Sequence, residues 1–433
     1  MVVRYTINHY GPLASEVTGA DTSRLAGMVT LLMTGTLAGF LIVSYVPGAL
    51  GVDSRVATVP FRGLMLLLQL YALFRFLGAG HLRMGMSIVS VVAVFFWTVY
   101  SLRFIVDAAF LQIPLGTAPS DMALSLFAIC LPTFLVLYQI RDIELYRKAL
   151  PWSMLALGVC CLASMLRTRT SQDVTLHGRY QGNDILNSVS YGHMGVTAII
   201  LGLFVLLQIG RVKRAWYLRV GAAGTVCLGA FSILAASSRG ALVAGVLVIP
   251  LIGYLGIRCG SRFVTVAMCI VLAFVLSVTA SYFSRNGLKL DRLLASAAAY
   301  DTSSNSVNTR HNMIRDAWRE YMDHPWLGSS IVERNALIYP HNAMVEAFMA
   351  TGTFGGSAFA LLILTAIYRA MRFIRRDPAM AWIPVCFFQQ LIGAMFSGGL
   401  YGNVPLWGMM AIVLGADLPR KRPLLPARRL SSS

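Results

Sequence analysis

The sequence predicts an all-α, polytopic integral membrane protein with about 12 transmembrane helices, and three observations support this fold class. Of the 433 residues, 57% are hydrophobic and only 12% are charged, where a soluble domain carries about 25% charged residues. The mean hydropathy is +0.68. The apolar residues form continuous runs, whereas the strands of an outer-membrane barrel alternate apolar and polar residues. This number of charged residues is too small for the surface of a soluble protein, and we therefore expect most of the surface to contact lipid.

Twelve apolar runs are each about as long as a membrane span requires, roughly 17–25 residues. They divide the chain into a cytoplasmic N-terminal segment (1–26), nine helices (27–282), a long outer loop with short helices between helices 9 and 10 (283–342), three helices (343–418) and a basic cytoplasmic tail (419–433). The first run is too long for the apolar part of a signal peptide, so we expect a retained helix. The expected spans are 27–48, 61–79, 86–106, 121–140, 149–166, 188–210, 217–237, 240–257, 262–282, 343–369, 380–398 and 403–418.

The distribution of basic residues predicts the orientation. Most of the 36 Lys and Arg residues fall in segments that face the cytoplasm if the N-terminus lies inside, which is the arrangement that the positive-inside rule favours. We therefore expect both termini in the cytoplasm and the long loop on the outer face. The net charge of +18 follows mostly from this topology and from the basic tail, which would lie on anionic headgroups. Nucleic acid is not an expected partner.

The cysteines and histidines predict neither a disulfide nor a metal site. None of the seven cysteines falls in an expected outer loop, there is no CxxC pair, and the seven histidines are scattered along the chain. Structural zinc sites need closely spaced groups of such ligands.

A short polar turn, Ser237-Ser238-Arg239-Gly240, separates two apolar runs with almost no loop. Arg239 is therefore expected at or inside the outer membrane boundary, where a charge is costly and points to function. Its guanidinium is well matched to phosphate oxygens. The alternative is a side chain that only extends to the membrane surface and ends a helix.

Tyr339-Pro340-His341-Asn342 precedes the tenth expected span. Pro340 interrupts the preceding chain, so His341 and Asn342 are expected at a helix N-terminus, where an anion is favoured. Glu346 follows Asn342 by one helical turn. An imidazole at this boundary could act as a general base near neutral pH. The alternative is an interfacial histidine beside an N-capping asparagine.

The long outer loop is expected to contain an amphipathic helix at 308–322, in which Ile314 and Trp318 recur at helical spacing and Arg315 lies on another face. Loops of this length are usually functional. Two arginines in outer segments, Arg179 and Arg310, are weaker candidates for a binding role, because most loop arginines are simply solvated. His193 and His324 are expected to be structural.

The order of these motifs resembles the O-antigen ligase and O-antigen polymerase superfamily. Ser-Ser-Arg-Gly (237–240) ends a span, the long loop carries Arg310 and His-Pro-Trp-Leu-Gly (324–328), and Pro-His-Asn (340–342) leads into a helix with Glu346 and the Gly-rich segment 352–356. The similarity covers roughly 179–367. The family often has His-Pro-His-Asn where this chain has Tyr339, which leaves His341 in place.

This resemblance implies a metal-independent membrane glycosyltransferase without a cofactor, in the bacterial inner membrane with its active face in the periplasm. The donor would be a glycan on undecaprenyl diphosphate, and the acceptor a hydroxyl of lipid A-core or of another lipid-linked glycan. His341 would act as the base on the acceptor hydroxyl or would position it. Arg239 and Arg310 would bind the diphosphate, with Arg179 as a further partner, and Ser238, Asn342 and Glu346 would support the site.

Three functions remain open from the sequence. The ligase leads, and a polymerase that joins lipid-linked repeat units uses the same donor and fold. The third is a transporter of polysaccharide lipids. Transporters commonly contain repeats and polar residues in broken helices at mid-membrane, whereas here the elaborated loop lies outside and late in the chain.

Overall fold

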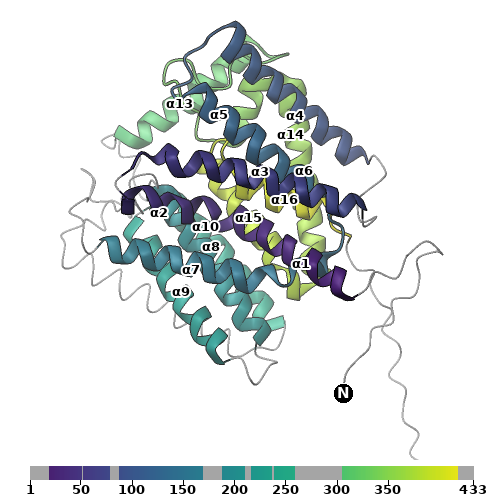
Figure 1. Ribbon diagram of the computed structural model, residues 1–433. Helices are drawn as coiled ribbons and strands as arrows, with labels where there is room; N and C mark the ends of the chain where they lie inside the picture. Colours follow the sequence, from purple (N-terminus) through teal and green to yellow (C-terminus); the bar gives the residue numbers. More distant parts are fainter. Residues whose placement is uncertain are drawn as a thin grey trace, which may run out of the picture.

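The computed structural model describes residues 19–50, 52–78, 87–168, 188–209, 216–236, 238–258 and 305–417. Within these ranges the chain is a bundle of helices, accompanied by one isolated antiparallel bridge between Glu333 and Ile338 (Figure 1). The predicted all-α class is confirmed for this part of the chain.

Among the described residues, eight helical segments are long and apolar enough to cross a membrane. Shorter apolar helices lie at Gly240–Leu255, Trp382–Phe396 and Val404–Gly415. Together they coincide with every expected span except 262–282, which lies outside the described residues. The chain is therefore a multi-pass membrane protein, and the count of twelve spans stays a prediction. The eight long segments are Ser23–Pro47, Ser54–Gly78, Ile88–Phe110, Pro119–Gln139, Ile143–Arg167, Ser188–Gln208, Trp216–Ala236 and Ala343–Arg376.

In the first half of the chain, several spans consist of an α-helix followed directly by a wider π-helical turn. These turns are Gly35–Gly39, Val106–Phe110 and Leu124–Cys130. A capping box of Ser87 and Ser90 begins α4, because the two serines satisfy backbone N–H groups that the first turn leaves unpaired. The helices are α1 (Gly19–Thr34), α2 (Phe40–Leu50), α3 (Ser54–Gly78), α4 (Ile88–Ile105), α5 (Pro119–Ala123), α6 (Leu131–Gln139) and α7 (Ala149–Thr168), with a 3₁₀ turn at Ile143–Tyr146.

The second half holds the helices that carry the candidate residues. Its longest helix, α14, is broken at Gly352, whose φ of 64° lies outside the helical region. The helices are α8 (Ser188–Ile209), α9 (Trp216–Ala236), α10 (Arg239–Arg258), α13 (Asn305–Asp323), α14 (Ala343–Arg376), α15 (Trp382–Phe396) and α16 (Val404–Gly415), with a 3₁₀ turn at Pro378–Met380.

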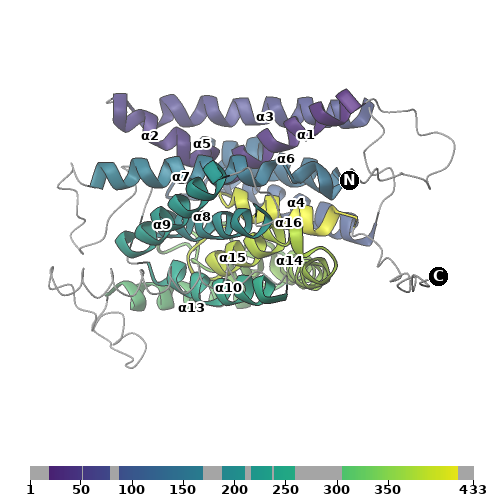
Figure 2. The same ribbon diagram turned by 90° about the horizontal axis from the view of Figure 1, so that it is seen from below.

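Figure 2 shows α3 along one side of the bundle and α10 and α13 along the opposite side. Between them, α8 contacts α7, α9, α10 and α15, while α14 packs on α4, α13, α15 and α16. The span in α8 is 83% buried within the protein, against 22% for the span in α3. Large side chains of α3, such as Leu64, Leu67 and Phe74, are exposed, as expected for a helix whose outer face contacts lipid.

Aromatic rings from four helices form the core between α4, α6, α14 and α16. Trp97 of α4 and Trp407 of α16 have ring centroids 4.3 Å apart, and Phe96 lies 5.1 Å from Phe359 of α14. Phe134 of α6 packs edge-on against Trp407 at 5.8 Å. All five side chains are buried. Because such rings bury large areas in fixed geometry, they hold the middle of α14 against α4 and the start of α16.

Glycines let α8 and α9 approach closely. A Cβ at Gly229 would lie 2.6 Å from the backbone oxygen of Gly195, whereas a Cβ at Gly224 on the same helix would meet nothing within 4 Å. Without a hydrophobic driving force between helices in lipid, such small residues permit the close backbone packing that holds membrane helices together.

The glycine contact predicts that Gly229→Ala lowers the thermal unfolding midpoint in detergent relative to Gly224→Ala. Both variants gain a similar helix propensity, about 1 kcal/mol, but only the methyl group at 229 meets fixed backbone, and overpacking costs about 1–3 kcal/mol. Equal midpoints for the two variants would contradict this close packing.

Candidate active site

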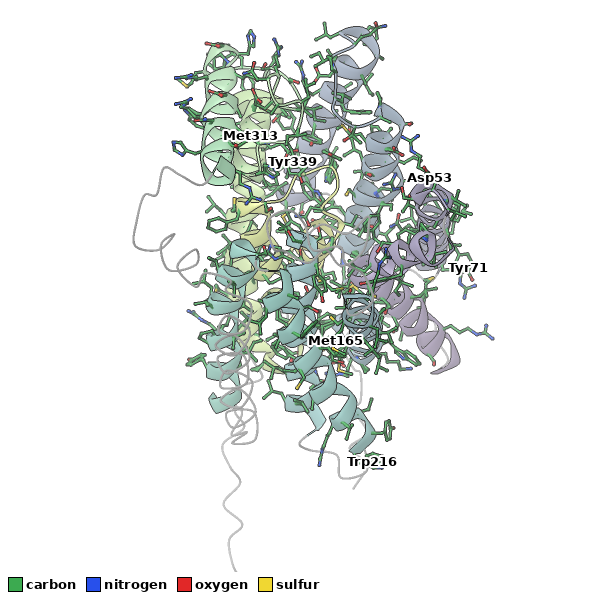
Figure 3. The ribbon with its side chains drawn as sticks, turned by 90° about the vertical axis from the view of Figure 1, so that its left-hand side faces the viewer. Asp53, Tyr71, Met165, Trp216, Met313 and Tyr339 are labelled. Carbon is green, nitrogen blue, oxygen red and sulfur yellow. The ribbon has the colours of Figure 1, made fainter. Side chains whose placement is uncertain are left out.

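The carboxyl end of α15 and the loop after it, residues 397–403, form the centre of the candidate site. Three elements meet there: α8, the start of α10, and the segment that leads into α14. Figure 3 shows Tyr339 and Met313 of α13 at one end of the molecule and Trp216, the first residue of α9, at the opposite end. The segment before α14 and the helix α13 therefore lie toward the end of the molecule opposite the start of α9.

His341 lies directly before the cap of α14 in a left-handed backbone conformation, with φ of 58°. This conformation is uncommon for residues other than glycine and is found at functional sites that the surrounding structure holds in place. The imidazole ring contacts the ring of Tyr339, with centroids 4.8 Å apart, and makes a hydrogen bond with the backbone of Ser397. Its Nδ1 atom is buried and has no hydrogen-bond partner among the described residues.

The environment of His341 favours a neutral imidazole. Burial lowers its pKa, the positive charge of Arg310 lowers it further, and the hydrogen bond with Ser397 partly opposes both. A lowered pKa means that the ring is unprotonated at neutral pH and can accept a proton.

Asn342 is the N-cap of α14. Its Oδ1 accepts hydrogen bonds from the backbone N–H groups of Met344 and Val345, both at 3.1 Å. Its Nδ2 donates to the backbone oxygen of Met395 at 3.2 Å. Because one side chain both caps α14 and bonds to the end of α15, the position of His341 relative to α15 is fixed.

Glu346 is fully buried one turn inside α14. Its Oε1 accepts a hydrogen bond from the hydroxyl of Tyr100 at 2.8 Å, and its two oxygens accept from the backbone N–H of Leu400 at 3.1 and 3.0 Å. The carboxyl group therefore connects α4 and α14 to the 397–403 loop, and it acts on His341 through that loop.

Tyr339 forms one wall of the site. It packs on Gly399, where a Cβ would lie 2.8 Å from the tyrosine ring, and its ring centroid is 6.0 Å from that of Tyr401. Burial raises the pKa of Tyr339, and the charge of Arg310 partly opposes this. The position where the family often has histidine is thus a packed aromatic side chain here.

The start of α10 lies beside the end of α15. A Cβ on Gly240 would be 3.6 Å from Cβ of Phe396, the residue before Ser397. Ser238 is buried, and its backbone oxygen accepts the hydrogen bond of Leu242 at 3.0 Å. Arg239 is the first residue of α10, and its side chain lies outside the part that the structure describes.

Of the other two candidate arginines, Arg310 lies within the described residues and Arg179 does not. Arg310 is on α13, which packs on α14, and its charge acts on both His341 and Tyr339. Arg179 lies outside the described residues, so its role stays a prediction. The structure thus brings His341, Asn342, the start of α10 and Arg310 to one region.

The expected helix at 308–322 is observed as α13, with a somewhat different buried face. Met313 and Ala317 are its buried residues, while Trp318 is 45% exposed. Trp318 and Tyr321 contact Phe348 of α14, with ring centroids 6.3 and 5.3 Å apart. The helix is thus held against α14 by small and aromatic side chains together.

The His-Pro-Trp-Leu-Gly motif (324–328) contacts the Gly-rich segment 352–356, and this contact fixes the end of α13. The backbone N–H and hydroxyl of Thr353 donate to the backbone oxygen of Pro325 at 2.6 and 2.8 Å. The hydroxyl of Tyr321 lies 3.0 Å from that of Thr353. Gly352 contacts the backbone of Trp326 so closely that a side chain would collide with it. The break in α14 therefore holds the end of α13, and with it Arg310, near the site.

Asp107, which the sequence analysis missed, fixes the rest of the outer segment. It is fully buried, pairs with Arg103, and accepts a hydrogen bond from the backbone N–H of Ile331 at 2.7 Å. The sequence did offer a signal for this role, since Asp107 is an acidic residue at the end of an apolar run, and a carboxylate buried there requires hydrogen-bond partners.

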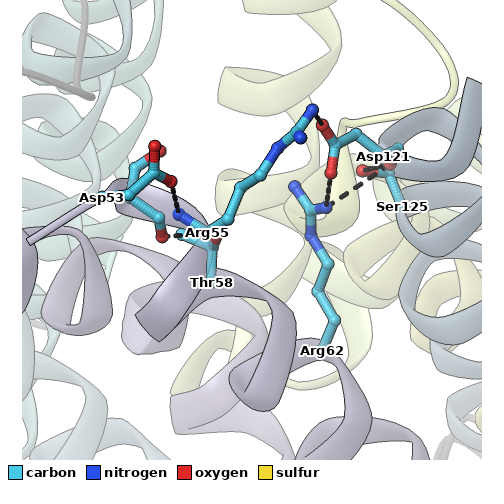
Figure 4. Close-up of polar contacts among 7 residues, drawn as sticks. Asp53, Arg55, Thr58, Arg62, Asp121 and Ser125 are labelled. Carbon is cyan, nitrogen blue, oxygen red and sulfur yellow. Dashed lines mark hydrogen bonds and ion pairs between the residues drawn. The ribbon is translucent and has the colours of Figure 1, made fainter. Parts of the chain in front are cut away.

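A second charged cluster joins α3 to α5 (Figure 4). Asp121 pairs with Arg55 at 2.7 Å and Arg62 at 3.5 Å, and Asp53 accepts a hydrogen bond from the backbone N–H of Arg55 at 2.7 Å. Two carboxylates offset two guanidinium groups, so this cluster connects helices and is not an anion site. Among the described residues, no group of three or more His, Cys, Asp or Glu side chains could hold a metal ion.

The Glu346 contacts predict that Glu346→Gln lowers the unfolding midpoint and speeds protease cleavage within the 397–403 loop. In either orientation the NH2 group of the glutamine replaces an oxygen that accepts from the N–H of Leu400, so two donors face one another, and a buried hydrogen bond lost in this way costs about 1–3 kcal/mol. Tyr100→Phe, which removes one bond and leaves the loop bonds intact, should protect the loop better. A Glu346→Gln protein with wild-type midpoint and cleavage rate would contradict this role.

The comparison with known proteins agrees with this geometry. Residues 223–360 match a family model described as O-antigen ligase. The match includes the start of α10, Arg310, His341, Asn342, Glu346 and the break at Gly352, which are the parts that the structure brings to one region. No curated protein matches the chain. Over residues 223–360 the chain is therefore similar to the O-antigen ligase family.

Proposed function

We propose that the protein is an O-antigen ligase-type glycosyltransferase. It transfers a polysaccharide from undecaprenyl diphosphate to a hydroxyl of lipid A-core at the periplasmic face of the bacterial inner membrane. The observation that carries the proposal is the neutral, half-buried His341, held beside the charge of Arg310 and the start of α10. In this proposal, His341 would be the base, and the arginines with the start of α10 would bind the diphosphate.

In the proposed reaction, His341 takes the proton of the acceptor hydroxyl through Nδ1, the ring nitrogen without a protein partner. The acceptor oxygen then attacks the anomeric carbon of the donor. A new glycosidic bond forms, the bond between that carbon and the diphosphate breaks, and undecaprenyl diphosphate leaves with the electron pair. A single displacement of this kind inverts the anomeric configuration.

The leaving diphosphate gains negative charge, and fixed positive charges stabilise it most where water is excluded. Arg310 and Arg239 would supply this charge, and Arg179 could add to it. Guanidinium groups bind phosphate oxygens in a bidentate manner, so the transfer needs no metal ion. The main alternative is a polymerase, which would use the same donor with a lipid-linked repeat unit as acceptor.

The first prediction from this proposal concerns His341→Asn in a deletion strain. Asparagine tolerates the left-handed backbone that His341 adopts, so the fold should persist while the base is lost. We expect transfer to fall by about 10²-fold or more. His311→Asn, an exposed histidine on α13, is the control and should retain wild-type transfer.

Gel analysis of the lipopolysaccharide separates the possible functions. Core without polysaccharide, together with accumulated lipid-linked chains, supports the ligase. Core that bears a single repeat unit supports the polymerase instead. An unchanged ladder for His341→Asn would overturn both and favour the transporter.

The second prediction concerns the pH dependence of transfer by the purified protein in liposomes. The charge of Arg310 holds the pKa of His341 down, so Arg310→Gln should raise that pKa. Because the base works only when neutral, the acid limb of the rate profile should move to higher pH. Arg310→Lys keeps the positive charge and should leave the limb in place. A slower Arg310→Gln enzyme with an unshifted acid limb would contradict the electrostatic coupling.

A further inference from the structure

His193 of α8 lies between the start of α10 and the end of α15. Its ring packs on Gly393 so closely that a Cβ there would lie 2.8 Å from Cε1. A Cβ on Gly240 would be 3.6 Å from its Nε2. The adjacent Gly192 packs on Ser238 and Ala241, also with no room for a side chain. The end of α8 therefore forms a wall of the Ser-Ser-Arg-Gly turn.

Hydrogen bonds around Gln389 indicate which nitrogen of His193 carries the proton. Gln390 donates to the hydroxyl of Thr197 at 3.4 Å, and that hydroxyl has two acceptors in reach, Oε1 of Gln389 at 3.1 Å and the backbone oxygen of His193 at 3.0 Å. The Nε2 group of Gln389 then faces Nδ1 of His193 at 3.1 Å. Because an amide nitrogen can only donate, Nδ1 is the acceptor, and in the neutral ring the proton lies on Nε2.

This Nε2–H group is buried and has no hydrogen-bond partner among the described residues. A buried donor without an acceptor is costly, and such groups in a native structure call for a physical explanation. With the Oε1 of Gln389 directed at Thr197, its Nε2 is directed at His193. The proton is thus kept on the side of the ring that faces Gly240.

The same region offers further donors. The helix α10 has 20 residues, and the backbone N–H of Leu242 in its first turn donates to the oxygen of Ser238, the residue before the helix. The N–H groups of its first turn have no acceptor within the helix, and the positive end of the helix dipole lies there. An anionic oxygen beside Gly240 would accept from this helix end and from His193 together.

We propose that His193 is a further substrate-binding residue, whose Nε2–H donates to a phosphate oxygen of the lipid diphosphate at the start of α10. The inference rests on the proposed function, which assigns the diphosphate to Arg239 and Arg310. Gly240 contributes to the same subsite, because a Cβ at this position would be in contact with Nε2, at 3.6 Å. His193 binds the leaving group and takes no proton from the acceptor.

The test measures binding of undecaprenyl diphosphate without a glycan to the full-length protein in nanodiscs. His193→Leu removes the donor and keeps an apolar side chain of similar size, and we expect about a tenfold weaker Kd. His193→Gln retains an N–H donor and should bind more tightly than His193→Leu. Gly240→Ala, which places a methyl group in ordinary contact with Nε2, should also weaken binding.

Two controls separate binding from folding. Thr58→Ala removes another buried polar group, on the distant helix α3, whose hydroxyl bonds to Ser54 within that helix. It should leave the Kd unchanged. The unfolding midpoint of each variant is measured without lipid, and a Kd change that only follows the midpoint would overturn the proposal.

The outcomes also separate this inference from the proposed function. If the wild type does not bind undecaprenyl diphosphate, the proposed function fails. If it binds and His193→Leu binds equally well, only the role of His193 fails. Phosphorylated lipid A-core is the second probe. If His193→Leu weakens its binding and spares undecaprenyl diphosphate, the assignment to the donor is overturned.

Discussion

The candidate site depends on the buried carboxyl group of Glu346. Its oxygens accept hydrogen bonds from Tyr100 of α4 and from the backbone of Leu400, so one side chain fixes the loop between α15 and α16 against α14. That loop supplies the backbone bond to His341 and the surface on which Tyr339 packs. A buried acidic group requires several donors, and satisfying it places the candidate base.

The outer segment before α14 is held in a different way. It has little regular structure between α13 and α14, yet its backbone is bonded at Pro325 to Thr353, beside the break in α14, and at Ile331 to Asp107, beyond the end of α4. Positive φ angles at Gly352 and His341 are the cost of these turns. These turns bring Arg310 and His341 close together, although the two residues are 31 positions apart in the sequence.

Much of the fold could be predicted from the sequence, because a span is a local property of hydropathy and length. The cap at Asn342 and the helix α13 were local signals of the same kind. The contacts of Asp107 with Ile331 and of Glu346 with Leu400 were not predictable, since their partners lie 224 and 54 positions away. For His193 a structural role was expected, and its packing on Gly393 agrees, but only the geometry shows the buried Nε2 beside Gly240.

The central claim is that the start of α10 meets the end of α15 beside His341, and a disulfide tests it most directly. Gly240→Cys with Phe396→Cys would place two Cβ atoms about 3.6 Å apart, within the range of about 3.5–4.5 Å that a disulfide needs. In a background without the native cysteines, the account predicts a cross-link that forms on oxidation, while Val243→Cys, on an exposed side of α10, forms none with the same partner. Equal cross-linking of both pairs, or none for Gly240→Cys, would contradict the account.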